Sequence, residues 1–70
     1  MKRVPLESSN LRAIAYLYEE QILEIEFHHS GVYQFYRVPV AVFFELLNAD
    51  SAGRYFNEEV KGHFRFRKIC

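Results

Sequence analysis

Hydrophobic and polar residues alternate with a period of two along much of the first half of this chain. The clearest stretch is 22–28, where Leu23, Ile25 and Phe27 alternate with Glu24, Glu26 and His28. Such alternation is typical of a strand that is buried on one side only. The pattern predicts antiparallel strands at residues 11–18, 22–28 and 32–38, with His29-Ser30-Gly31 as a three-residue hairpin loop.

The strand registers are mutually consistent. Pairing Phe27 with Tyr33 across the second turn, and Tyr16 with Leu23 across the first, separates the side chains into two sets. The set predicted to form the core is Ile14, Tyr16, Leu23, Ile25, Phe27, Tyr33 and Phe35. The opposite, mostly solvated set is Ala13, Ala15, Glu24, Glu26, Gln34 and Tyr36. A slip of one residue in either hairpin would bring glutamates into the core.

The period then changes to that of a helix. Pro39 is expected at the first helical position, and residues 40–49 place apolar side chains on a wide stripe. Ser51 is expected to cap a second short helical segment that runs to Val60, and Gly62 to end it. Residues 63–69 alternate again. The predicted fold is therefore α+β: a three-stranded antiparallel meander packed under one or two short helices, plus a C-terminal edge strand. Residues 1–7 form an extended segment, and residues 8–69 a single domain.

Composition restricts the class of protein. Half of the 70 residues are hydrophobic, with seven Phe and five Tyr, which is too apolar for a disordered chain. The one cysteine, Cys70, excludes an internal disulfide and favours a reducing compartment, so a cytoplasmic location is expected. No apolar run is long enough for a membrane span or a signal peptide, and no membrane partner is expected. A domain of this size has little depth for an active site, and no catalytic residues or cofactor are expected.

The charge is unevenly distributed. Residues 1–50 hold four basic and seven acidic side chains, a net of −3, whereas residues 51–70 hold five basic and two acidic ones, a net of +3. The overall charge of zero argues against a dedicated polyanion binder, but the C-terminal part allows a local basic patch.

Several short motifs occur in an order and spacing that are specific when taken together. They are Ser8-Ser9-Asn10, Ile14-Ala15-Tyr16, Leu23-Glu24-Ile25-Glu26-Phe27, Gly31-Val32-Tyr33-Gln34-Phe35, Val38-Pro39 and Ser51-Ala52-Gly53-Arg54-Tyr55-Phe56-Asn57. On these residues the chain resembles the KTSC domain, a module named for its occurrence at the C-terminus of some lysyl-tRNA synthetases and also found alone in bacterial and phage proteins.

The resemblance covers residues 8–69, nearly the whole chain, with two departures. The family's central Tyr-x-Tyr is Tyr33-Gln34-Phe35 here, so a second hydroxyl is absent unless Tyr36 supplies it, and Ala15 replaces a usual glycine. The resemblance implies RNA binding and supplies no catalytic residues.

Two groups of residues are candidates for contact with RNA. Tyr33 and Phe35 have the spacing of a base-stacking platform, although packing beneath the helix is the commoner role for such residues. Gln34 and Tyr36, on the open face, are better placed to contact a ligand. The second group is the basic C-terminal strand with residues nearby in sequence: Lys61, His63, Arg65, Arg67, Arg54, Tyr55 and Asn57. Protection of a sheet edge against aggregation is the commoner role for such charges.

A metal site is not expected. Adjacent His28 and His29 point in opposite directions, and Glu24, Glu26 and His28 spread over about 13 Å of strand, too far for one ion. Two functions remain open. The first is weak binding of tRNA-like or single-stranded RNA through the basic strand. The alternative is a non-enzymatic protein-interaction module, in which a strand edge pairs with another protein or a second copy.

Overall fold

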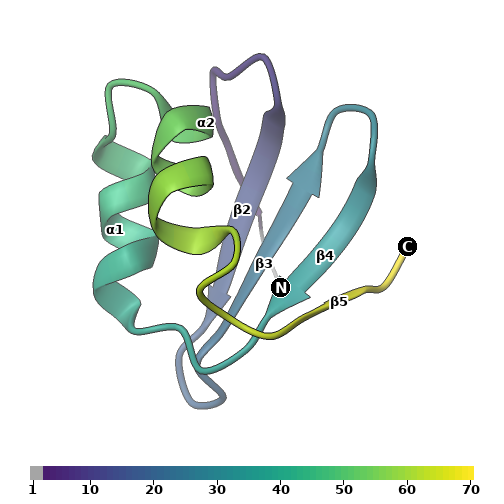
Figure 1. The fold of residues 1–70 in the computed structure, drawn as a ribbon, viewed down its shortest axis with the longest axis vertical. Coiled ribbons are helices and arrows are strands. Elements are labelled where there is room, and N and C mark those ends of the chain that lie inside the picture. The colour runs from purple at the N-terminus through teal and green to yellow at the C-terminus, as the bar shows by residue number, and fades with distance from the viewer. Residues whose placement is uncertain (1–2) are drawn as a thin grey trace.

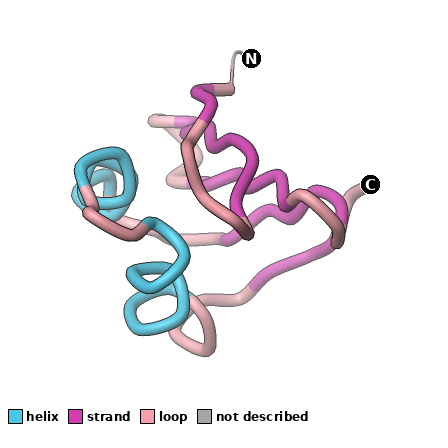
Figure 2. The backbone as a smooth tube through the Cα atoms, turned by 90° about the horizontal axis from the view of Figure 1, so that it is seen from above, coloured by secondary structure: helices cyan, strands magenta, loops and turns pink. Residues whose placement is uncertain are grey.

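The computed structural model describes residues 3–70 as one antiparallel sheet with helices on one of its faces (Figures 1 and 2). The sheet has five strands in the order β1-β2-β3-β4-β5. The strands are β1 (Val4–Pro5), β2 (Leu11–Leu17), β3 (Ile22–Phe27), β4 (Gly31–Phe35) and β5 (Phe66–Lys68). The helices are α1 (Val40–Asn48), α2 (Ala52–Tyr55) and the π-helical turn η1 (Phe56–Val60). The predicted α+β class is confirmed, with one strand more than expected because β1 pairs with β2.

The predicted pairing of the first two long strands is confirmed, with Tyr16 opposite Leu23 and Ile14 opposite Ile25. The pairing of β3 with β4 is displaced by two residues from the prediction, since Phe27 lies opposite Gly31 and Ile25 opposite Tyr33. The loop is 28–30, one residue earlier than predicted, and Gly31 has the left-handed backbone expected of it, with a φ of 93°. A displacement of two residues leaves every side chain on its predicted face.

The core lies between the sheet and the helices, and the predicted core face is confirmed. All its members are buried except Tyr33, which is half-buried against the cluster. Phe43 and Leu46 of α1, with Val38 and Val60, cover the sheet from the other side. The ring of Tyr16 stacks on that of Phe43 at 5.6 Å, and its hydroxyl donates to the carbonyl of Val38. Burial, and to a lesser extent Tyr18, raises the pKa of Tyr16.

An irregularity at the start of β2 adds Leu11 to this core. Leu11 pairs with Phe27 but Ala13 pairs with Glu26, so one extra residue, Arg12, is accommodated as a bulge. Strict alternation would place Leu11 on the same face as Ala13. The bulge reverses its direction, and Leu11 is fully buried among the core residues.

The opposite face of the sheet corrects one prediction. Glu24 was expected in solvent, yet it is 4% exposed, and its neighbour Ala15 is buried. The Nη2 of Arg3 lies 2.7 Å from Oε2 of Glu24, and the amide of Gln34 donates to Oε1 at 3.0 Å. Glu24 therefore points to the predicted face but is enclosed there, because the segment around β1 folds back along β2. A buried carboxylate requires such partners.

The second half of the chain follows the prediction with small shifts. Pro39 is the residue before α1 rather than its first member, and the α1 helix ends at Asn48. The hydroxyl of Ser51 accepts from the amide of Arg54 at 3.2 Å, which confirms the predicted cap. The C-terminal strand is shorter than the predicted 63–69 and joins β4, with Arg67 opposite Gln34. Within residues 3–70, no helix is both long and apolar enough to cross a bilayer.

Candidate nucleic-acid interface

The outer face of β4 and β5 brings together four residues singled out from the sequence. Arg67 lies opposite Gln34, and the amide of Tyr36 donates to the carbonyl of Arg65 at 2.9 Å. Paired residues of adjacent strands share a face, and Phe35 next to them points into the core, so the side chains of Gln34, Tyr36, Arg65 and Arg67 lie on the opposite face of the sheet. Figure 2 shows that the helices cover only one of the two faces. The hydroxyl of Tyr36 reaches the side chain of Gln34 at 3.5 Å, and the amide of Gln34 is held by Glu24.

A hollow at the end of this face is lined by Tyr36, Arg37, His63, Phe64 and Arg65. It adds His63, a predicted candidate, and Arg37, which sequence reasoning missed. Arg37 has a φ of 56°, a conformation that costs roughly 1–2 kcal/mol for a residue with a side chain. The sequence offers no signal for this, since Arg37 was assigned to the interior of a strand.

The arginines on the outer face of β5, and Arg37 beside it, lack acidic partners among residues 3–70. Arg3 and Arg12 pair with the glutamates of β3, and Arg54 pairs with Glu58. Within residues 3–70, by contrast, no ion pair involves the basic residues of the C-terminal side, namely Arg37, Lys61, Arg65, Arg67 and Lys68. We call Arg37, His63, Arg65 and Arg67, together with Tyr36, the basic strip. The side chains of its three arginines are exposed and available to an anion.

The remaining candidates lie elsewhere. Arg54 lines a separate hollow with Glu7 and Asp50, and its Nε is 3.4 Å from Glu58, so its charge is locally balanced. Asn57 and Lys61 line a third hollow beneath η1. The basic residues that lie close together along the chain therefore do not form one continuous site, because the helical segment directs Arg54 and Tyr55 away from β5.

Tyr55 joins the helices to each other. Its hydroxyl donates to the carboxylate of Glu45 on α1. Burial, and then the hydrogen bond to Glu45, raise the pKa of Tyr55 from 10.0 to about 12. Tyr55 thus packs against the core and links α2 to α1.

The Tyr55 phenol is expected to destabilise the fold in alkali. Between its ordinary pKa of 10.0 and about 12, the unfolded chain loses the phenolic proton while the folded chain retains it. The folded state then holds more protons, so stability falls as pH rises through this window. Urea unfolding at pH 9 and 11 should show a smaller loss for Tyr55→Phe than for the natural chain. Equal losses in both proteins would contradict this role for Tyr55.

The aromatic pair of β4 belongs to the inner face. Phe35 is 4% exposed within the core cluster, and Tyr33 is half-buried beside it, with ring centroids 6.5 Å apart. The packing interpretation is thus confirmed for Phe35. Both rings also border the hollow beneath η1.

Comparison with known proteins identifies the class. Residues 7–64 match the KTSC domain family, and the chain belongs to that family. A crystal structure of a KTSC domain protein from Yersinia pestis superimposes with a TM-score of 0.96 at 38% identity, covering 99% of this chain and 97% of that one. The resemblance inferred from the sequence motifs is confirmed.

Relatives fall into two kinds. An uncharacterised protein of Stutzerimonas stutzeri is 49% identical over 99% of both chains. A lysine–tRNA ligase of Nostoc punctiforme is 38% identical over 90% of this chain, which spans only 11% of that protein. The domain therefore resembles both a separate small protein and a small part of a larger enzyme.

Proposed function

We propose that this domain is a non-enzymatic accessory module that binds single-stranded or tRNA-like RNA through the basic strip. The main support is the segregation of charge: the arginines of the strip have no acidic partner within residues 3–70, whereas Arg3, Arg12 and Arg54 are paired. Arginine in this state binds phosphate oxygens and releases the counterions condensed on the nucleic acid.

The neighbouring aromatic residues add a second contact. Tyr36 and Phe64 border the same hollow as Arg37 and Arg65, and both side chains are half-exposed. A base stacked on such a ring contributes roughly 1–3 kcal/mol without sequence preference. With few phosphate contacts and an overall charge of zero, the affinity should be weak and sequence-tolerant.

The relatives provide independent support. A segment similar to this chain occurs in proteins named lysine–tRNA ligase, in which a small RNA-binding module would assist contact with tRNA. The same proposal fits a separate protein of this size, since it requires no partner domain.

Arg37→Gly is the variant that best tests the assignment. Glycine suits the φ of 56° at this position, so the fold should be retained while one cation is lost. In an NMR titration with a short oligouridylate, we expect affinity for the natural chain to fall more than about tenfold between 50 and 200 mM salt. Arg37→Gly should bind about three- to tenfold more weakly at low salt, with a shallower salt dependence.

Arg54→Gln is the matched control, because it removes an arginine that is already paired with Glu58. Its affinity should equal that of the natural chain. Amide shifts confined to regions outside residues 36–37 and 63–67, or equal losses for the two variants, would exclude the basic strip as the RNA site.

A protein-interaction module is the second candidate, and one observation favours it. The outer edge of β5 pairs with no strand within residues 3–70, and Phe66 and Ile69 there are 59% and 43% exposed. Strand pairing with another chain would use that edge. A complex that persists in high salt on a sizing column would favour this candidate, since phosphate contacts dissociate there.

A further inference from the structure

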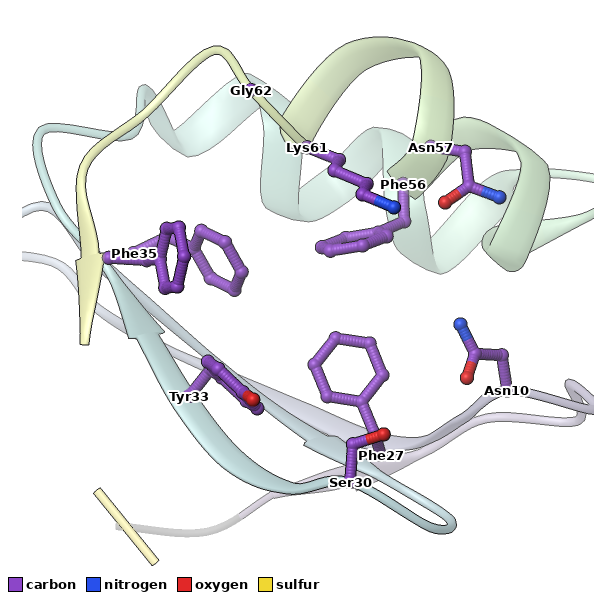
Figure 3. A pocket seen from close by; sticks show the side chains of 10 residues that line it. Asn10, Phe27, Ser30, Tyr33, Phe35, Phe56, Asn57, Lys61 and Gly62 are labelled. Atoms are coloured by element: carbon purple, nitrogen blue, oxygen red, sulfur yellow. The ribbon is translucent and has the colours of Figure 1, made fainter. Parts of the chain in front are cut away.

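A cavity of about 290 Å³ lies on the other side of the sheet from the basic strip, between η1 and the inner face of β3 and β4 (Figure 3). Its walls are aromatic, with rings contributed by Phe27, Tyr33, Phe35, Phe56 and Phe66. Polar groups surround it, namely the side chains of Asn10, Ser30, Asn57 and Lys61. We call this space the aromatic cavity.

The rings pack against one another and line one side of the cavity. Phe27 and Phe56 meet edge to face at 5.2 Å, and in Figure 3 they face the hollow together with Tyr33. Phe66 forms the outer wall, with ring centroids 5.8 Å from Tyr33 and 5.6 Å from Phe35, yet it is 59% exposed. An exposed phenyl group beside a cavity of aromatic rings is a surface that an apolar, planar ligand would cover.

The polar groups select an anionic ligand that can form hydrogen bonds. Lys61 forms no ion pair within residues 3–70, and of the ten described residues that line the cavity, none is acidic. The side-chain amides of Asn10 and Asn57 line the cavity and are exposed. A carboxamide offers both donors and an acceptor, as the edge of a nucleobase does.

We propose that the aromatic cavity binds a nucleotide, with the base among the rings, its polar edge toward Asn10 and Asn57, and its phosphate at Lys61. Stacking on the ring walls supplies the affinity, and the ammonium group selects the phosphate. This goes beyond the proposed function, because a free nucleotide would bind whether or not RNA contacts the basic strip.

Adenosine 5′-monophosphate is the probe. Titrated to about 5 mM against the natural chain, it should shift the ring resonances of Tyr33, Phe56 and Phe66 with a dissociation constant of about 1 mM or tighter. Adenosine should bind several-fold more weakly because it lacks the phosphate, and ribose 5-phosphate should leave the rings unshifted. Unmoved ring resonances with adenosine monophosphate would overturn the proposal.

Two variants locate the site. Phe66→Ala removes an exposed ring from the cavity wall and should have little effect on folding. Lys61→Gln removes the cation. Each variant should bind adenosine monophosphate at least about fivefold more weakly. Phe44→Ala is the matched control, since Phe44 is 47% exposed on α1 and borders no part of the cavity. An equal loss in Phe44→Ala and Phe66→Ala, or shifts confined to residues 36–37 and 63–65, would overturn the cavity assignment while leaving the RNA proposal standing.

Competition then identifies the source of the nucleotide. If an oligoadenylate displaces adenosine monophosphate from the aromatic cavity, the natural ligand is a nucleotide within RNA. If the oligoadenylate binds without displacing it, the ligand is a free nucleotide. Either outcome supports the cavity as a nucleotide site, and Arg37→Gly should alter only the binding of the oligonucleotide.

Discussion

A chain carrying Arg65→Glu and Arg67→Glu is expected to bind single-stranded RNA at least about tenfold more weakly at low salt than the natural chain. Both side chains are exposed on the outer face of the sheet, beside Gln34 and Tyr36, and neither pairs with an acidic group within residues 3–70. At the proposed RNA site, the substitution would remove phosphate contacts and add repulsion. It should leave the fold intact, because both arginine side chains are exposed and Phe64, the side chain of this segment that packs against the core, is unchanged.

Fluorescence anisotropy with a labelled oligouridylate measures this loss. The neutral pair Arg65→Gln and Arg67→Gln separates lost contacts from added repulsion, and should give a smaller reduction. Ala41→Glu with Phe44→Glu changes net charge by the same amount as the neutral pair, but on α1, far from β5 (Figure 1). Equal affinity losses for these two charge-matched variants would mean that RNA responds only to net charge, contrary to a located site.

Ile25→Ala is expected to cost about 2–5 kcal/mol of stability, because it leaves a cavity in the centre of the core. Ile25 is fully buried in β3, the middle strand of the sheet. A domain of 70 residues has a free energy of unfolding of about 4–10 kcal/mol, so this single change removes a large part of it or unfolds the chain. The midpoint of urea unfolding measures the loss.

Two further variants make the result decisive. Ile69→Ala is the same chemical change at a residue that is 43% exposed, and should cost less than about 1 kcal/mol. Ile25→Val removes a single methylene and should cost about 0.5–1.5 kcal/mol, which remains measurable if the alanine variant does not fold. Similar costs for Ile25→Ala and Ile69→Ala would contradict the arrangement of the core.

The sheet could be predicted in outline because its signals are local. The alternation around Ile25, the turn at Gly31 and the cap at Ser51 each depend on a few consecutive residues. The error in pairing Phe27 with Tyr33 was harmless to the face assignment, because two residues make one full period of a strand.

The candidate site was predicted less well than the fold. Basic residues close together in sequence proved to be separated: Arg54 lies in an acidic hollow, Lys61 borders the aromatic cavity, and Arg65 with Arg67 faces outward from β5. The left-handed backbone of Arg37 places its side chain beside the other residues of the basic strip, and no local sequence pattern predicts that conformation.

The sequence by itself determined the three central strands and the helical segments in outline, and which side of the central hairpins faces the helices, because period and turn chemistry act over a few residues. Only the tertiary structure decided how the outer face of the sheet is covered, where Leu11 points and which strand β5 joins. The fold of the N-terminal segment places Arg3 on Glu24, the bulge at Arg12 turns Leu11 inward, and β5 joins β4. These depend on contacts between segments distant in sequence, where the free energy of packing, rather than local preference, selects the partner.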